Sequence, residues 1–300
     1  MSVRIKRWWQ TSIIGRNPSL AVGCATVGVF VLIAIFGRLL EPYSATAQVG
    51  GVFAPPSAHH LLGLDDSGYD ELSRLIEGAR VSLLVGGTAS AVAMMIGGSI
   101  GITAGYLGGR VDAVLMRITD YFIVVPALPL MIVVAAVWGP SLLHVILIVG
   151  VLLWSWPARV VRAHVLSLRE RGFIHRAQAM GASRRRIIIH HVLPHTRAML
   201  IANVVLTVAV AIFFEAALAF LGLESASTIS WGTMIASAYQ RAAISTGAWW
   251  AIVPPGACIA LVVIGCNLIG TAIEDSANPR IRMMHISRRR ASVLAPGADP

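Results

Sequence analysis

The sequence predicts an all-α polytopic membrane protein with six transmembrane helices. Hydrophobic residues make up 56% of the chain, and the mean hydropathy is +0.75. Six apolar stretches are visible, at residues 20–40, 82–105, 113–138, 142–158, 199–221 and 249–273. Most reach the length of about 17–25 residues with which a helix crosses a hydrocarbon core. Because backbone in lipid must satisfy its own hydrogen bonds, a helical bundle is the consistent interpretation.

The first stretch, residues 20–40, is predicted to remain in the protein as a transmembrane helix after a cytoplasmic segment, residues 1–19. Basic residues before it and the Ala45-Thr46-Ala47 tripeptide after it superficially resemble a cleavable signal peptide. Signal peptides carry an apolar core of about 7–15 residues, whereas this stretch is longer and starts late. The length therefore favours an uncleaved helix.

Residues 41–81 are predicted to form an outer segment that contains a short amphipathic helix. Asp70 has the right chemistry to cap its first turn, and Leu72, Leu75 and Ile76 fall on one face before Gly78. Such a helix is expected to lie at the outer membrane interface. The alternative is that the same residues simply lead into the second span.

Residues 82–282 are predicted to form the core, with five further helices and short loops after the second and third spans. Pro140 and Pro157 bracket the fourth and shortest stretch. Pro126, Pro129, Pro254 and Pro255 lie within spans and are expected to kink them. The Arg-, Ala- and Pro-rich tail, residues 283–300, is predicted to be disordered.

Basic residues predict that both termini face the cytoplasm. Most of the 24 Lys and Arg residues lie in the two terminal segments, at Arg110 and in residues 159–197. On this topology few fall outside, namely Arg38, Arg74, Arg80 and Arg241. This asymmetry follows the positive-inside rule. The net charge of +10 is thus assigned to membrane topology and anionic lipid, not to nucleic acid, because aromatic residues do not alternate with the basic ones.

The inner segment 159–197 is the most informative stretch, since it contains the polar sequence GFIHRAQAMGASRRRIIIHHVLP at residues 172–194. Phe173, Ala177 and Met180 form an apolar stripe at helical spacing. Gly181 is expected to end that helix and Ser183 to cap a second one that begins at Arg184. The second helix carries Ile187 and Ile188 and is expected to end at Pro194. The pattern predicts a helix–turn–helix outside the membrane.

Three arginines, 184–186, occupy the first turn of the second helix, where they oppose its dipole. Such a local conflict often marks a functional surface. Binding to anionic headgroups is the alternative explanation. The apolar stripe likewise has an alternative, which is packing against the inner face of the bundle itself.

Acidic residues inside spans are costly and therefore candidate functional residues. Asp120 lies three residues after Arg117, so an ion pair on one helix face is expected. Glu215 lies in the outer half of the fifth span and is a second candidate of this kind.

Other classes of function fit the sequence poorly. No metal site is predicted, because only His191 and His195 share a helix face and Pro194 lies between them. Cys24, Cys258 and Cys266 lie in apolar spans without metal-ligand spacing. An ion-coupled secondary transporter would need several midplane acids or an inverted repeat. An intramembrane enzyme would need convergent catalytic groups. A P-loop is excluded because Lys6, the only lysine, lacks a glycine-rich context.

Four ordered blocks resemble permease subunits of ABC importers. Gly181 and, twelve residues later, Leu193-Pro194 match the coupling-loop pattern, with His191 at its variable position, although His175 and Arg176 replace the usual Glu and Ala. Residues 59–86, 220–235 and 266–282, the last with Asn278-Pro279-Arg280, resemble blocks of dipeptide and oligopeptide permeases. The chain is identified by this resemblance as similar to a C-type subunit of the dipeptide, oligopeptide and nickel permease family.

The resemblance implies a type I ABC-importer permease fold in a bacterial inner membrane. It implies a second permease subunit, two ATP-binding subunits that hold ATP and magnesium, and an extracytoplasmic peptide-binding protein. No cofactor is expected on this chain itself. A peptide substrate is favoured, and a nickel importer is the alternative. The residues expected to contact an ATPase subunit are Phe173, His175, Arg176, Ala177, Met180, Gly181, Ser183, Arg184, Ile187, Ile188, His191, Leu193 and Pro194. The residues expected to dock the binding protein are Asp65, Asp66, Trp231 and Gly232. Glu215 is assigned to the translocation path or to the interface with the second permease subunit, and Asp120 is a second candidate for that role.

Overall fold

A computed structural model describes residues 17–225 and 227–277. The predicted tail, most of the amino-terminal segment and the Asn278-Pro279-Arg280 motif lie outside the described residues. Within them, five helices are long and apolar enough to cross a membrane, or six if one sharply bent pair counts as a single span. The all-helical membrane architecture expected from the composition is confirmed.

The first span is α3, Pro18–Phe36, which ends in the short turn η1, Gly37–Leu39. A loop then leads to α4, a single 37-residue helix from Glu71 to Leu107. At 1.5 Å per residue α4 is about 55 Å long, so it extends beyond a hydrocarbon core of about 30 Å. The expected cap is confirmed, since the Asp70 carboxylate accepts a hydrogen bond from the Ser73 backbone N–H at 2.9 Å.

A separate interfacial helix before Gly78 is therefore wrong, and the alternative of a lead-in to the second span is correct. Gly78 does not interrupt α4, because its missing side chain makes room for Trp231. A methyl group placed there would lie 3.1 Å from the Trp231 ring. Tertiary packing thus explains a glycine that looked like a helix stop.

The third span is broken. Helix α5, Gly109–Val124, and helix α6, Ala127–Trp138, meet at an angle of 83°. Pro126 lies at the break, where it supplies no N–H for a continuous helix and forces Val125 into an extended conformation. The kink expected at Pro126 is therefore confirmed, and it is a complete break between two helices within the predicted span 113–138.

The fourth span consists of α7, Leu142–Leu152, and α8, Ser155–Arg169, which together cover 28 residues. Pro157 was expected to end the span. It lies instead in the first turn of α8, where the N–H it lacks would have had no helical partner. The span consequently continues to Arg169, eleven residues beyond the predicted end at 158.

Helix α9, Gly172–Ala179, is followed by α10, Arg184–Ile187, and by η2, a π-helical turn at Ile188–Val192. The chain then runs directly into α11, Leu193–Phe220. Pro194 therefore does not end a helix, as the sequence had suggested, but lies at the start of α11. A π-turn just before a proline is a common way to relax the helical register where an N–H is missing.

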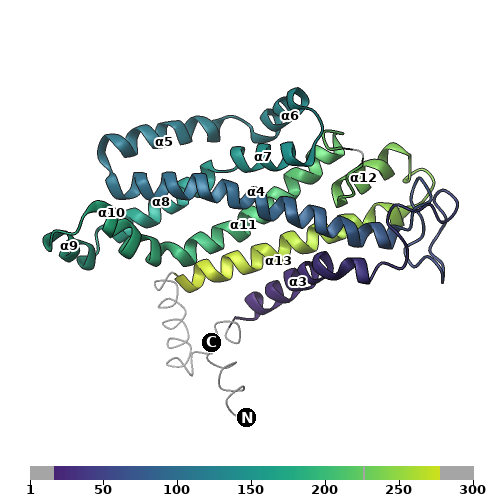
Figure 1. Ribbon diagram of the computed structural model, residues 1–300, viewed down its shortest axis with the longest axis horizontal. Helices are drawn as coiled ribbons and strands as arrows, with labels where there is room; N and C mark the ends of the chain where they lie inside the picture. Colours follow the sequence, from purple (N-terminus) through teal and green to yellow (C-terminus); the bar gives the residue numbers. More distant parts are fainter. Residues whose placement is uncertain (1–16, 226, 278–300) are drawn as a thin grey trace, which may run out of the picture.

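The last elements are α12, Trp231–Gln240, the turn η3, Trp249–Ala251, and α13, Val253–Ala277. Figure 1 shows α9 and α10 at one end of the elongated bundle and α12 at the other, beside the loop between α3 and α4. The polar segments of the chain thus gather at two opposite ends of the helices.

Helix α4 lies at the centre and packs along α8, α11 and α7. Its face toward α8 is formed by glycines four residues apart, at 97, 101 and 105. A methyl group at Gly101 would lie 2.6 Å from the Ala158 carbonyl oxygen, and one at Gly105 would lie 2.9 Å from that of Arg162. Small residues at this spacing let two membrane helices approach closely.

Candidate functional site

The segment Gly172–Pro194, which we call the elbow, projects from the end of the bundle (Figure 1). Gly181 has φ +80°, in the left-handed region that glycine adopts without strain, and ends α9 as predicted. Ser183 caps α10, because its hydroxyl accepts a hydrogen bond from the Arg186 backbone N–H at 3.3 Å. The predicted helix–turn–helix is confirmed.

One side of the elbow is buried against the bundle. Ile174, Ala177 and Ile187 are buried in a cluster with Tyr106 of α4 and Val161 of α8. The apolar stripe therefore anchors the elbow to its own subunit, which was the alternative interpretation for Ala177 and Ile187. Ile174, which the sequence reasoning missed, is the largest of the α9 side chains so buried. Its spacing of three from Ala177 was the available signal.

The other side of the elbow is exposed and strongly basic. Met180 is 82% exposed, although it was grouped with the apolar stripe. His175, Arg176, Gly181, Ser183 and Arg184–Arg186 are also exposed. An exposed methionine among cations forms a surface with apolar and charged contacts available to another molecule.

Phe173 of the elbow is half-buried. Its ring stacks on His195 with centroids 4.8 Å apart and lies 6.4 Å from the His191 ring. Ile188 is half-buried, whereas Leu193 and Pro194 are exposed at the start of α11. Among the described residues, no group of three or more His, Cys, Asp or Glu side chains is arranged to hold a metal.

At the opposite end, Asp65 and Asp66 belong to a compact ionic cluster. The Arg74 Nη1 atom donates to Asp65 Oδ2 at 2.6 Å, and Arg241 lies 3.5 Å from Asp66 Oδ2. Burial, and next the Asp65 carboxylate, raise the pKa of Asp66 above its ordinary value. Asp65 is buried, so its charge holds the loop to α4 and offers little surface.

Trp231 and Gly232 are not on the surface, which corrects their assignment to binding-protein docking. Trp231 is 0% exposed, its ring packs edge-on against Phe30, and its Nε1 donates to the Leu75 carbonyl at 3.0 Å. Gly232 is buried against Ala216 of α11. These residues lock α12 to α3, α4 and α11.

Asp120 pairs with a different arginine from the one expected. Arg159 of α8 donates to Asp120 Oδ1 at 2.6 Å, while Arg117, on the same helix as Asp120, is exposed. The expected Arg117–Asp120 pair is wrong, because α8 brings a better-placed guanidinium against α5. Asp112 and Arg162 form a second pair between the same two helices, through two hydrogen bonds of 2.5 Å.

Glu215 is 0% exposed, so in this structure it neither lines a path nor faces a partner, contrary to the expectation. Ser82 of α4 donates to its Oε2 atom at 3.4 Å. Glu224, which the sequence reasoning missed, is also buried and accepts a hydrogen bond from Ser230 at 3.2 Å. The visible signal was an acid in a short loop directly after an apolar span.

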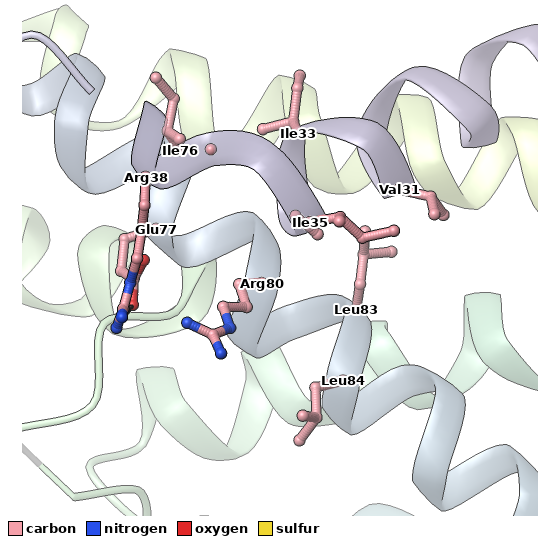
Figure 2. Close-up of a pocket in the computed structure, with 11 residues that line it drawn as sticks. Val31, Ile33, Ile35, Arg38, Ile76, Glu77, Arg80, Leu83 and Leu84 are labelled. Atoms are coloured by element: carbon pink, nitrogen blue, oxygen red, sulfur yellow. Dashed lines mark ion pairs between the residues drawn. The ribbon is translucent and has the colours of Figure 1, made fainter. Parts of the chain in front are cut away.

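Between the C-terminal part of α3 and the N-terminal part of α4 lies a groove with a volume of about 630 Å³. Figure 2 shows Val31, Ile35, Leu83 and Leu84 on one side and Arg38, Glu77 and Arg80 on the other. Arg38 lies 3.7 Å from Glu77, in an ion pair at the rim. The groove therefore combines an apolar wall with a charged edge at the end of the first span.

The family comparison decides the class of protein. Residues 97–283 match the family described as binding-protein-dependent transport system inner membrane component. The chain belongs to this family. The matched region contains α8, the elbow, α11, α12 and α13, so the elbow is part of the shared architecture.

Individual members of the family are similar over nearly the whole chain. The dipeptide transport system permease protein DppC of Escherichia coli is 38% identical over 275 residues, which cover 89% of this chain and 91% of that protein. DppC of Alkalihalophilus pseudofirmus is 37% identical over 89% of this chain and 88% of its own. The di/tripeptide permease DppC of Pseudomonas aeruginosa is 33% identical over 93% of both. The chain is thus a membrane-embedded transport subunit.

Proposed function

We propose that this chain is the permease subunit of an ATP-driven peptide importer and forms half of its translocation path. The observation that carries the proposal is the similarity, over about nine-tenths of the chain, to proteins named as dipeptide permeases. Those names favour peptides over nickel as the substrate. A second permease subunit is proposed to complete the path.

The elbow is proposed to couple this subunit to an ATPase subunit. Its anchored side, with Ile174, Ala177 and Ile187 in the bundle core, would transmit force to α4 and α8. Its exposed side, with Met180 and the arginines, would provide the contact surface. A rigid attachment on one side and a free surface on the other is what a mechanical coupling element requires.

The proposed complex contains two ATP-binding subunits, which would hold ATP and magnesium, and an extracytoplasmic peptide-binding protein. We propose that the elbow and both termini face the cytoplasm. The start of α5 and the end of α8 lie with the elbow toward one end of the bundle (Figure 1), and these segments contain Arg110, Arg169 and the elbow arginines, in keeping with the positive-inside rule. The ionic cluster of Asp65 and Arg74 would then lie outside.

Uptake by cells lacking their own peptide permeases tests the substrate. The chain is expressed together with a second permease subunit, ATPase subunits and a binding protein encoded beside it, and uptake of a labelled dipeptide and of radioactive nickel is measured. Dipeptide uptake that requires this chain supports the proposal. Uptake of nickel alone, or of dipeptide by the purified chain without ATPase subunits, contradicts it.

The docking of the binding protein is proposed on exposed parts of the outer segments instead of Trp231 and Gly232. Leu61 is 65% exposed and Ile244 is 69% exposed. Single cysteines at these positions are expected to crosslink to a peptide-loaded binding protein, and a cysteine at buried Trp231 is not. Crosslinking confined to the Trp231 position would overturn this placement.

A further inference from the structure

Two carboxylic acids approach each other inside the subunit, near the outer end of α11. Glu215 is 0% exposed on α11, and Glu224 is 5% exposed in the segment between α11 and α12. Their carboxyl groups lie within hydrogen-bond reach of one another. Each has a buried Oε1 atom without a hydrogen-bond partner among the described residues.

Among the residues that the structure describes, hydroxyl groups contact the pair and no cation acts on it. Ser82 of α4 donates to Glu215 Oε2 at 3.4 Å, and Ser230, the cap of α12, donates to Glu224 Oε2 at 3.2 Å. The Trp231 backbone N–H donates to Ser82 Oγ at 3.2 Å, which closes a network across α4, α11 and α12. Within the described part of the chain, the only charged group acting on either acid is the other acid.

Two buried negative charges at this separation, without a cation, carry a large desolvation and repulsion cost. A single proton removes the cost. A neutral carboxyl group donates one O–H, so a proton on either acid supplies a hydrogen bond to the other carboxylate. The hydroxyl bonds to the two Oε2 atoms remain in place.

We propose that the Glu215–Glu224 pair is a proton-binding site, in which one shared proton ties the outer end of α11 to the start of α12. Independent support comes from Glu224, which lies outside the membrane-spanning helices. Burial, and next the Glu215 carboxylate, raise the pKa of Glu224 to about 8. A proton is favoured over a metal ion, because among the described residues no group of three or more His, Cys, Asp or Glu side chains is arranged to hold a metal.

This inference does not depend on the proposed substrate or on transport. It is tested on the assembled complex by infrared spectroscopy, in which the C=O stretch of a neutral carboxylic acid is separate from that of a carboxylate. The wild-type protein is expected to show a neutral-carboxyl band at pH 7 that disappears on titration with a midpoint near pH 8. A midpoint near the ordinary glutamate value of 4.5 overturns the proposal.

Variants assign the band to the pair. Glu224→Gln is expected to abolish the titration, because its amide permanently donates to the Glu215 carboxylate. Glu215→Gln removes the repulsive charge, so the midpoint is expected to fall by at least about one pH unit. Glu170→Gln, at an exposed position, is the matched control and leaves the band unchanged. A band that survives Glu224→Gln unaltered contradicts the assignment.

Changing the cation of the buffer salt distinguishes a bound proton from a bound metal ion. The titration is repeated in sodium, potassium and choline chloride at equal ionic strength. A proton site gives the same midpoint in all three salts. A neutral-carboxyl band that appears only in choline chloride shows that an alkali cation occupies the pair, and this overturns the proposal. The absence of any carboxyl group that titrates near pH 8 in the wild type overturns the proposal by itself, so the proposal can fail even if a substitution prevents assembly.

Discussion

Arg159 and Asp120 form an ion pair of 2.6 Å across 39 residues of sequence. Arg159 lies near the start of α8, and Asp120 lies in the last turns of α5, just before the break at Pro126. The pair therefore fixes the end of the broken third span to the fourth span. Both side chains are close to half exposed, at 45% and 47%, so solvent competes for the charges.

We expect Asp120→Asn to lower the free energy of unfolding by at most about 1 kcal/mol, because exposed ion pairs contribute little. Arg159→Gln is expected to have the same effect, and the double variant is expected to be no worse than either single one. Arg117→Gln is the matched control and is expected to be silent. Thermal unfolding of the complex in one detergent measures all four. If Arg117→Gln lowered the unfolding temperature and Arg159→Gln did not, Asp120 would pair with Arg117, as expected from the sequence.

The contact between α4 and α8 is expected to tolerate no added atoms at Gly101. A methyl group there would lie 2.6 Å from the Ala158 carbonyl oxygen, which is backbone and cannot rotate away. Gly101→Ala is therefore expected to cost about 1–3 kcal/mol as an overpacking change, although alanine favours the helix.

Gly87→Ala provides the control for Gly101, because Gly87 lies in the same helix with nothing within 4 Å of the added methyl group. It is expected to leave the unfolding temperature unchanged or to raise it. Equal unfolding temperatures for the two variants would show that α4 and α8 do not approach as closely as the structure indicates.

Local chemistry made several features predictable from the sequence. The Asp70 cap, the turn at Gly181 and the Ser183 cap were all correct, because each depends on residues within a few positions of one another. The apolar stretches were also correct as helices. In these cases the backbone groups to be satisfied and the side chains that satisfy them are neighbours in sequence.

Features set by distant partners could not be predicted in this way. Gly78 leaves space for the Trp231 ring, which lies about 150 residues later in the sequence, and this contact helps to bury Trp231. Asp120 is paired through α8, not through its own helix. Glu215 was correctly singled out as an intramembrane acid, but only the folded chain shows that its neighbour is Glu224. Prolines 157 and 194 looked like helix ends and lie at helix starts.

The turn at Gly181 is expected to be essential for coupling, a prediction that rests on the proposed function. Gly181→Arg places a non-glycine residue at φ +80°, which costs about 1–2 kcal/mol, and adds a long side chain to the exposed surface of the elbow. We expect peptide uptake to be lost while the protein remains in the membrane. Nothing lies within 4 Å of an added methyl group, so the bundle itself is not disturbed.

Gly181→Asn tests whether the turn itself or the added bulk of arginine causes the loss of uptake. Asparagine adopts left-handed conformations more readily than other non-glycine residues, so the turn is expected to be kept. The variant is expected to retain most uptake. Gly172 lies in α9, has no positive φ, and has nothing within 4 Å of an added methyl group. Gly172→Ala is therefore expected to leave uptake unchanged. Wild-type uptake by Gly181→Arg in membrane vesicles would refute the role assigned to the elbow.

Removal of the Trp231 ring is expected to release α12 from the bundle. The side chain is completely buried, contacts Phe30 and donates a hydrogen bond to the Leu75 carbonyl. Trp231→Ala is expected to cost about 3–5 kcal/mol, and Trp231→Phe about 1 kcal/mol for the lost hydrogen bond. Unfolding temperatures of the complex rank the variants. If the alanine variant were as stable as the wild type, Trp231 would not be a core residue, and its predicted docking role would be favoured again.

The Glu215–Glu224 pair is expected to make the subunit less stable as the pH rises. The pKa of Glu224 is about 8 in the folded protein and close to its ordinary value of 4.5 when unfolded. Between these values the folded state holds a proton that the unfolded state lacks. Its contribution to stability is therefore complete below about pH 4.5 and is lost as the pH rises through about 8.

The slope of this loss is about 1.4 kcal/mol per pH unit for one proton. Other groups titrate over the same range, so the informative quantity is the difference between wild type and Glu224→Gln. That difference is expected to change steadily up to about pH 8 and to level off above it, because the glutamine variant has no proton to lose. Glu170→Gln is expected to follow the wild type. If the unfolding free energies of the wild type and of Glu224→Gln ran parallel from pH 5 to 9, the pair would hold no proton in the folded state. A bound proton would make the two curves diverge by the slope given above.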